Sequence, residues 1–278
     1  MRLDTRALLT AYDGDGFVVV PELLDAAALA RLRGALEAVV SGAGGLPRHL
    51  SEKVFFEHQH VRNNPHWYEG VLTPEECGGA VRQIDDLPLF GEEFARLVTH
   101  PPLLDVLEAL FRSTEFSLVQ CGGRPKAPRV GNGISDGHFH RDTPFEEFTR
   151  VNTVLVILCL DEMSSANGGT GFVRASHRVS DEEAKQLRWR DVPPSELKQE
   201  EIVTPRCAAG SGLFFNTKVL HNATHNRSER PRYSVFLEWV GPGVLPTSAE
   251  RHAYQGLRPR SRDPEYRRQL EMTFPAFA

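Results

Sequence analysis

Two histidines and one aspartate in the sequence could form a metal centre. His140 and Asp142 lie two residues apart in GHFHRDTPF, so on an extended chain both side chains point to the same face. His221 follows the apolar run LFFNTKVL and could supply a third ligand from a neighbouring strand. Two imidazoles and one carboxylate on one face of an octahedron leave three positions open, which is typical of ferrous iron in non-haem oxygenases. The HExxH motif that is typical of zinc hydrolases is absent.

An arginine is expected close to this centre. Arg232 follows His221 by eleven residues, and the polar segment between them can connect two adjacent antiparallel strands. Arg232 begins the otherwise apolar run RYSVFLEWV, where an inward-facing guanidinium needs a carboxylate partner. No partner is obvious in the chain, so a dicarboxylate cosubstrate is the natural candidate. The alternative is a structural ion pair with a nearby Asp or Glu.

Other histidines could replace members of the ligand set. His138 would share a face with its neighbour two residues on and could bind in place of Asp142, while His225 could bind in place of His221. We favour His221, because it directly follows the apolar strand and has the expected spacing from Arg232. Both rivals stay open at this point.

The segment 42–80 is predicted to be irregular, because it is rich in Gly, Pro, His and Asn. It forms either a substrate lid or a loop that packs on the helices, and its aromatic residues are Phe55, Phe56, Trp67 and Tyr68. Closer to the expected metal centre, Arg141 and Arg150 either recognise an anionic group of a substrate or are solvated at the surface.

The elements that must position these residues are helices first and strands later. A strand is expected over 16–20, a helix after Asp25 with a stop near Gly42, and a second helix over 103–111. From Phe116 onward, short apolar or alternating runs separated by turn residues predict strands without crossover helices. We therefore predict a mainly β fold with flanking helices, a jelly-roll-like sandwich.

Composition excludes several classes of protein. Of the 278 residues, 40% are hydrophobic and 25% are charged, which is ordinary for a globular chain. A net charge of −5 gives no electrostatic footprint for nucleic acid. No apolar run is long enough for a membrane span, and the first residues lack a secretory leader. Because the four cysteines stand far apart without a CxxC motif, we expect a cytoplasmic protein without a disulfide framework.

Several motifs, in order along the chain, resemble the phytanoyl-CoA dioxygenase family of iron(II)- and 2-oxoglutarate-dependent oxygenases. DGFVVVPELLDAAALARLRGALE is similar to that family's first strand and helix, and HPPLLDVLEALF to the helix before its barrel. FHRDTPF corresponds to its HxD segment, NGGTGFVRASHR to its PGSHR-like turn, and HNATHNRSERPR to its distal His and Arg motif. The resemblance covers roughly residues 14–240.

This resemblance implies a double-stranded β-helix, a cupin-like jelly roll, in which His140, Asp142 and His221 bind Fe(II). It also implies that Arg232 binds the distal carboxylate of 2-oxoglutarate through a bidentate, charge-assisted pair. Relatives that halogenate typically replace the carboxylate ligand with a small residue. Since Asp142 is retained, hydroxylation or a related oxidation is favoured over halogenation.

Further positions are transferred from the resemblance or depart from it. Gln120 and Thr153 lie where relatives can contact the cosubstrate. Arg174 and Ala175 replace the proline and glycine of the PGSHR-like turn, which puts the shape of that loop in doubt.

The resemblance implies one oxygenase domain over 1–278. Its parts are a helical N-terminal part at about 1–113, a jelly-roll core at about 114–242 and a tail at 243–278. The expected reaction oxidises an unactivated C–H of a small molecule, with O2 as a reactant and succinate and CO2 as products. The substrate is expected to be a natural-product intermediate of secondary metabolism. Desaturation, epimerisation or cyclisation at the same site, and a non-catalytic jelly-roll ligand-binding protein, are the alternatives.

Overall fold

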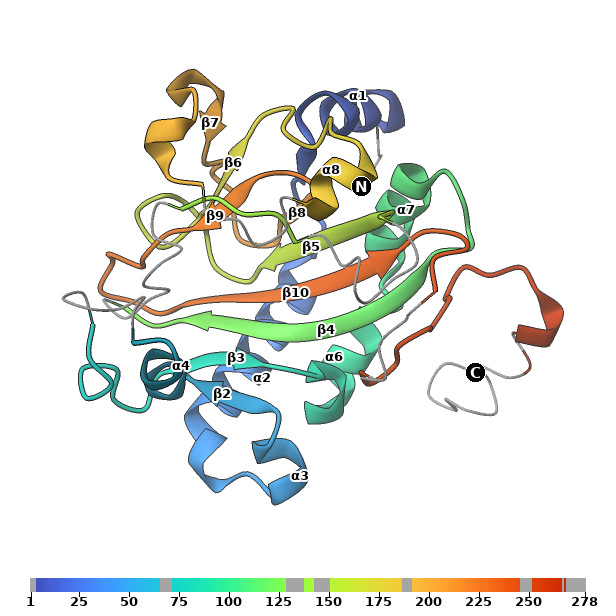
Figure 1. The fold of residues 1–278 in the computed structure, drawn as a ribbon. Helices are drawn as coiled ribbons and strands as arrows, with labels where there is room; N and C mark the ends of the chain where they lie inside the picture. Colours follow the sequence, from blue (N-terminus) through green and yellow to red (C-terminus); the bar gives the residue numbers. More distant parts are fainter. Residues whose placement is uncertain are drawn as a thin grey trace.

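The computed structural model describes residues 4–65, 72–128, 138–142, 151–186, 192–245, 252–266 and 268. Its centre is a seven-stranded antiparallel sheet, called the main sheet below (Figure 1). The strands, in spatial order, are β1 (Phe17–Val20), β8 (Gly212–Asn216), β5 (Thr153–Cys159), β10 (Arg232–Val240), β4 (Ser117–Lys126), β3 (Val81–Ile84) and β2 (Val54–Phe56). A second sheet, the small sheet, contains β7 (Ile202–Val203), β6 (Thr170–Val173) and β9 (His221–Ala223).

Helices cover the outer face of the main sheet, and α2 passes behind it in Figure 1. The α-helices are α1 (Thr5–Asp15), α2 (Ala26–Gly42), α3 (Arg48–Ser51), α4 (Glu57–Asn63), α6 (Glu92–Leu97), α7 (Pro101–Phe111) and α8 (Asp181–Gln186). Short 3-10 turns are η1 (Ala43–Gly45), η2 (Leu87–Phe90), η3 (Pro194–Glu196) and η4 (Gln199–Glu201). The strand at 17–20, the helix capped by Asp25 and the helix at 101–111 confirm the sequence predictions.

Alternation along β10 separates two hydrophobic cores. Val235, Leu237 and Trp239 pack with the helices on the outer face, where buried Trp239 meets Phe116 edge to face. Phe236 points to the inner face and belongs to the core that joins the main sheet to the small sheet. The expected jelly-roll-like fold with outer helices is confirmed.

In the inner core, aromatic rings join the two sheets. Phe172 of β6 stacks on Phe17 of β1 with ring centroids 4.5 Å apart, and it meets Phe215 of β8 edge to face. Phe172 is fully buried, and so is Leu213 on the strand beneath. This packing holds the small sheet over the β1–β8–β5 half of the main sheet.

The prediction that 42–80 is irregular is wrong for much of its length. The segment contains η1, α3, β2 and α4, and β2 pairs with β3 at the edge of the main sheet. Buried Glu57 starts α4 and accepts a hydrogen bond from Arg82 of β3 at 3.1 Å. Elements this short show no periodicity in sequence, because the helices are shorter than two turns and β2 has only three residues. Phe55 is 42% exposed, whereas Trp67 and Tyr68 lie outside the described residues.

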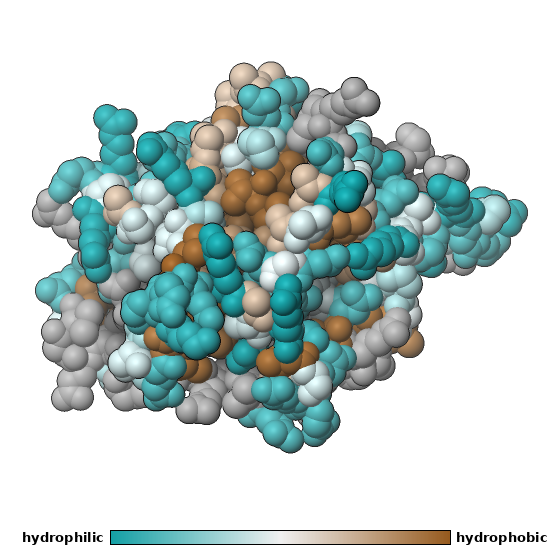
Figure 2. All heavy atoms as spheres, turned by 90° about the horizontal axis from the view of Figure 1, so that it is seen from above, coloured by the Kyte–Doolittle hydropathy of each residue, from teal (hydrophilic) through white to brown (hydrophobic). Residues whose placement is uncertain are grey.

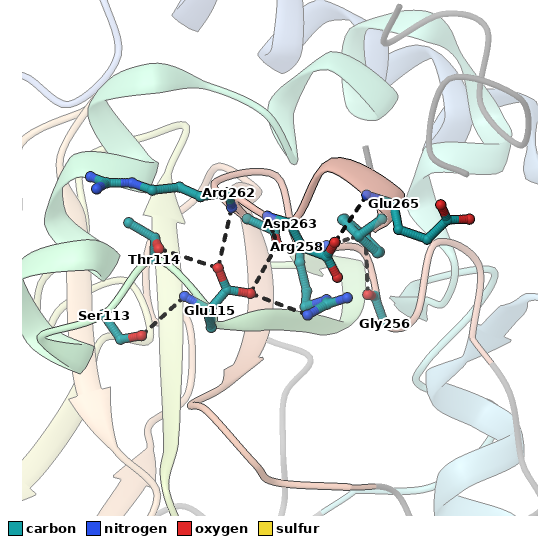
Figure 3. A network of polar contacts seen from close by, with 10 residues as sticks. Ser113, Thr114, Glu115, Gly256, Arg258, Arg262, Asp263 and Glu265 are labelled. Carbon is teal, nitrogen blue, oxygen red and sulfur yellow. Dashed lines mark hydrogen bonds and ion pairs between the residues drawn. The ribbon is translucent and has the colours of Figure 1, made fainter. Parts of the chain in front are cut away.

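A polar network attaches part of the C-terminal segment to the start of β4 (Figure 3). The Glu115 carboxylate accepts hydrogen bonds from the side chains of Arg258 and Ser261 and from the backbone N–H of Arg262. Backbone bonds between Leu118 and the 256–257 turn run beside this network. The segment therefore packs along the edge of the fold instead of extending from it.

The face seen from above is mostly hydrophilic, with a hydrophobic patch near its middle (Figure 2). Among the described residues, no helix is both long and apolar enough to cross a bilayer.

Candidate metal centre and cosubstrate pocket

The three predicted metal ligands lie together. Asp142 Oδ2 is 3.2 Å from His221 Nε2, and Asp142 Oδ1 is 3.5 Å from His140 Nε2. One ligand atom from each residue lies within 4.8 Å of the other two. Within the ranges that the structure describes, no other group of three such donors is this close.

Backbone pairing explains how residues distant in the chain meet here. The backbone groups of His140 and His221 exchange two hydrogen bonds of 2.9 Å, which bring the ring centroids within 4.5 Å. His221 Nδ1 lies 3.1 Å from the Val219 carbonyl. Since a carbonyl only accepts, Nδ1 donates its N–H to Val219, which leaves Nε2 facing Asp142 as the atom that can bind a metal.

The electrostatics of the site favour an ionised carboxylate. Burial alone would raise the pKa of Asp142, but the nearby His221 and His140 outweigh it and hold that pKa well below its usual value. His221 is buried, whereas His140 and Asp142 are half-buried. Two nitrogen donors and one anionic oxygen donor that converge at a partly open position fit a divalent transition metal. The residues present therefore fit Fe(II).

Arg232 lies at the first position of β10, buried, beside the main sheet's inner core. Its Nε donates to the Asn167 carbonyl, its Nη2 to the Gly168 carbonyl and its Nη1 to Ser234 Oγ, each at 3.1 Å. A guanidinium has five N–H groups, so two remain for a ligand. No carboxylate of the described residues forms an ion pair with Arg232. Burial lowers the pKa of the guanidinium. The same burial keeps water from the cation, so an anionic ligand there would be bound with little competition from water.

The second cation at this end of the strand pair is Lys126, which is directly opposite Arg232 in the β10–β4 register. Its ammonium donates to the carbonyls of Gly168 and Thr224 and is buried. Two buried cations side by side create a positive site that suits one end of a dicarboxylate.

Gln120 and Thr153 differ in how well they fit the transferred role. Gln120 is half-buried on the inner face and donates to Glu238 Oε2 at 2.8 Å, so its role as a cosubstrate contact stays a prediction. Thr153 pairs with Val240, at the opposite end of β10 from Arg232. Eight residues of strand correspond to about 26 Å. That separation exceeds the reach of one five-carbon dicarboxylate, so the geometry argues against Thr153 as a contact to the molecule that Arg232 would bind.

For Arg141, the structure contradicts one of the two roles considered from the sequence, solvation at the surface. It is buried, and it donates to the carbonyls of Lys218 at 2.8 Å and Ser176 at 3.0 Å. These bonds hold the loop next to His140 in place, which is a structural role. Arg150 lies outside the described residues. The alternation of residues predicts the facing of a side chain but not its partners, so the carbonyl contacts of Arg141 could not be predicted from the sequence.

The turn that departs from the family pattern keeps a glycine-like conformation. Ala175 has φ of 60°, in the left-handed region that favours glycine. Its backbone N–H donates to the Asp15 carbonyl at 3.0 Å, which ties the turn to the end of α1. Alanine therefore adopts this left-handed conformation at the cost of some backbone strain.

Arg124 is a charged residue of the inner face that the sequence analysis did not single out. It lies on β4, two residues from Lys126 and four from Gln120, and its guanidinium is 4.3 Å from the centre of the Phe236 ring. The period-two alternation of Gln120, Gly122, Arg124 and Lys126 along this strand was the signal that could have found it.

Comparison with known proteins places the chain in a family. Residues 12–234 match the phytanoyl-CoA dioxygenase (PhyH) family, and the chain belongs to it. This finding confirms the resemblance inferred from the motifs.

A sequence relative and two solved structures are similar to the chain. An "Fe(II)/2-oxoglutarate-dependent dioxygenase nvfF" from Aspergillus novofumigatus is 27% identical over 66% of this chain, and the match spans 58% of that relative's length. The epimerase SnoN, in complex with Fe3+, alpha-ketoglutarate and nogalamycin RO, has a TM-score of 0.64 at 19% identity, covering 90% of this chain and 94% of that one. The carbocyclase SnoK from nogalamycin biosynthesis has a TM-score of 0.64 at 16% identity, covering 96% and 91%. The two structures support the fold.

Proposed function

We propose that this protein is an iron(II)- and 2-oxoglutarate-dependent oxygenase that oxidises an unactivated C–H of a small molecule. His140, Asp142 and His221 would hold the metal, and Arg232 would hold the distal carboxylate of 2-oxoglutarate. The observation that carries the proposal is the convergence of the three ligand atoms within 4.8 Å of one another in a chain of this family. When bound, the metal and 2-oxoglutarate would supply the electrons that activate O2, the oxidant of the reaction.

The chain's own residues bind and orient the reactants. Asp142 stays ionised and provides the anionic ligand, while the Val219 carbonyl fixes the His221 ring so that Nε2 faces the metal position. The carbonyls of Asn167 and Gly168 hold the Arg232 guanidinium in one orientation. A fixed guanidinium gives a bidentate pair with a carboxylate at little entropic cost.

The outcome of the reaction and the substrate are proposed only as classes. SnoN is named an epimerase and SnoK a carbocyclase, so hydroxylation, epimerisation and ring formation all remain outcomes that one such site can support. Their biosynthetic context supports a natural-product intermediate as the substrate. The four described cysteines are buried and free, which is consistent with a reducing, cytoplasmic setting.

This function is tested by measuring the succinate that the purified protein forms from 2-oxoglutarate in the presence of Fe(II), O2 and ascorbate. Uncoupled turnover is expected even without the true substrate. Arg232→Gln should raise the KM for 2-oxoglutarate at least about a hundredfold, since a buried charge-assisted pair contributes about 3 kcal/mol. Arg206→Gln, which changes an exposed arginine, is the matched control and should leave the KM unchanged.

A non-catalytic ligand-binding protein is the competing function. It predicts no succinate at any iron concentration. Equal 2-oxoglutarate affinity in the parent protein and in Arg232→Gln would contradict the cosubstrate assignment, whichever activity is found.

A further inference from the structure

The inner face of the main sheet is divided into an apolar half and a polar half. The described core between the two sheets includes residues of β1, β5, β8 and β10, but none of β4 or β3. The polar half begins at β4, which is next to β10 and β3 in the sheet (Figure 1). Gln120 and Arg124 of β4 are half-buried there, and Arg82 and Asp85 are near enough to Arg124 to act on it electrostatically. The inner face is therefore polar at β4 and apolar from β10 to β1.

The ring of Phe236 supports the side chain of Arg124 in this half. Gly122 and Phe236 are directly opposite each other in the β4–β10 register. A Cβ at Gly122 would lie 2.1 Å from the Phe236 ring, so the ring lies against the strand only because residue 122 is glycine. The Arg124 guanidinium lies over the same ring, 4.3 Å from its centre. The stacking fixes the plane of the cation and leaves its N–H edge for another group.

Within the described part of the chain, the Arg124 guanidinium has no hydrogen bond and no ion pair. Three carboxylates are near enough to act on it electrostatically, those of Asp85, Asp142 and Glu57, but each is engaged elsewhere. Glu57 pairs with Arg82 at 3.1 Å, Asp85 accepts a hydrogen bond from the amide of a β3 neighbour, and Asp142 lies between two imidazoles. Among the residues that the structure describes, none is thus left to serve as a counterion for this half-buried cation beside the metal centre.

Burial and the like charge of Arg82 lower the pKa of Arg124 to about 10. The guanidinium is therefore still charged at neutral pH. A cation that is partly desolvated, close to another cation and stacked on a ring gains more from an anionic ligand than an exposed arginine does.

We propose that Arg124 binds a carboxylate of the substrate, so that the enzyme acts on small molecules that carry a carboxylate group. This inference rests on the proposed oxygenase function, which places the reacting carbon beside Asp142 and so within reach of Arg124. The planar N–H edge matches a carboxylate with two parallel hydrogen bonds. A phosphate dianion is disfavoured, because the carboxylates of Asp85 and Asp142 are close to the same position.

The test compares acid and amide probes of the same shape. Benzoate is paired with benzamide, and cyclohexanecarboxylate with cyclohexanecarboxamide. Binding is followed by ligand-observed NMR on protein loaded with Zn(II) and 2-oxoglutarate, so that no turnover occurs and Arg232 is occupied. The parent protein should bind at least one acid about tenfold more tightly than its amide, and Arg124→Gln should remove that preference. Arg124→Lys should retain part of it, and Arg206→Gln all of it.

Two results would overturn the proposal. One is that neither acid is preferred by the parent protein, or that Arg124→Gln and Arg124→Lys both keep the full preference. The other is that 2-oxoglutarate binds the iron-loaded Arg124→Gln variant more than about tenfold more weakly under anaerobic conditions, which would make Arg124 a cosubstrate residue.

If the parent protein binds neither metal nor 2-oxoglutarate, the proposed function fails. The probe titration on metal-free Arg232→Gln then still decides whether Arg124 prefers a carboxylate.

Discussion

At the scale of single residues, Asp86 joins parts of the chain that are far apart in sequence. Its side chain is 2% exposed and contacts Lys53 at 2.5 Å and His252 at 3.2 Å. It also accepts a hydrogen bond from the backbone N–H of Ala253. Burial alone would raise the pKa of Asp86, but these contacts outweigh it and lower the pKa below its usual value.

We expect Asp86→Asn to lower the free energy of unfolding by about 2 kcal/mol at pH 7, because it removes the anion from buried charge-assisted contacts. Asn keeps the φ of 50° that Asp86 adopts. The pKa is lower in the folded state, so the stabilisation is fully present above about pH 4 and is lost as the pH falls further. Denaturant unfolding at pH 7 and pH 3 should show the two proteins converging at low pH. Glu52→Gln, at an exposed pair, is the control, and a constant difference at both pH values would contradict this account.

At the scale of elements, β4 and β10 pair closely enough to demand glycine. A Cβ at Gly122 would lie 2.1 Å from Phe236 Cε1 and 2.8 Å from the Ile84 carbonyl oxygen. Gly34 in helix α2 has nothing within 4 Å of the same position. The two positions therefore form a matched pair for testing the packing of the inner face.

Gly122→Ala should lower the free energy of unfolding by about 2 kcal/mol, because the extra methyl displaces the Phe236 ring. Displacing the ring also removes the support of Arg124, so the acid-over-amide preference should fall in the same variant. Gly34→Ala should be neutral or slightly stabilising, since alanine favours a helix over glycine. Thermal and denaturant melts of the two variants test this; equal stability of Gly122→Ala and the parent would show that the close approach is not a constraint.

The elements differ in how far they could be predicted from sequence. β5, β8 and β10 are apolar or alternating runs, so their pattern reveals them, and the helices at 26–42 and 101–111 carry caps and periodicity. β2 and α4 were missed, because three to seven residues contain too little pattern and their stability comes from pairing with β3. The metal ligands were predictable from their types and spacing. The role of Arg124 was not predictable, because it depends on stacking against the Phe236 ring and on nearby carboxylates that already have other partners.

At the scale of the whole molecule, the C-terminal segment packs on the start of β4 through Glu115 (Figure 3). Arg258 contacts this carboxylate at 3.1 Å, and Ser261 Oγ donates to it at 2.9 Å. The Leu118 N–H donates to the Leu257 carbonyl at 2.9 Å, and the Gly256 N–H donates back to Leu118 at 2.8 Å. The segment and β4 thus support each other by side-chain and backbone contacts.

Glu115→Gln should loosen this attachment without unfolding the sheet. Because the contacts are partly exposed, the loss of global stability should be small, about 1 kcal/mol or less. Hydrogen exchange of peptides from 252–263 should become faster, while peptides from β5 and β10 should be unchanged. Glu265→Gln, at an exposed pair with Arg268, is the control. Equal acceleration in both variants would contradict a specific role for Glu115.

The most direct test of the account is an anaerobic titration of the purified chain with Fe(II) and then with 2-oxoglutarate, followed by visible absorption. We expect about one equivalent of iron to bind and a weak charge-transfer band to appear on addition of 2-oxoglutarate. His221→Ala should lose iron binding, whereas Arg232→Gln should bind iron but require far more 2-oxoglutarate for the band. Iron binding that is unchanged in His221→Ala, or a parent protein that forms no such band, would contradict the assignment of the centre.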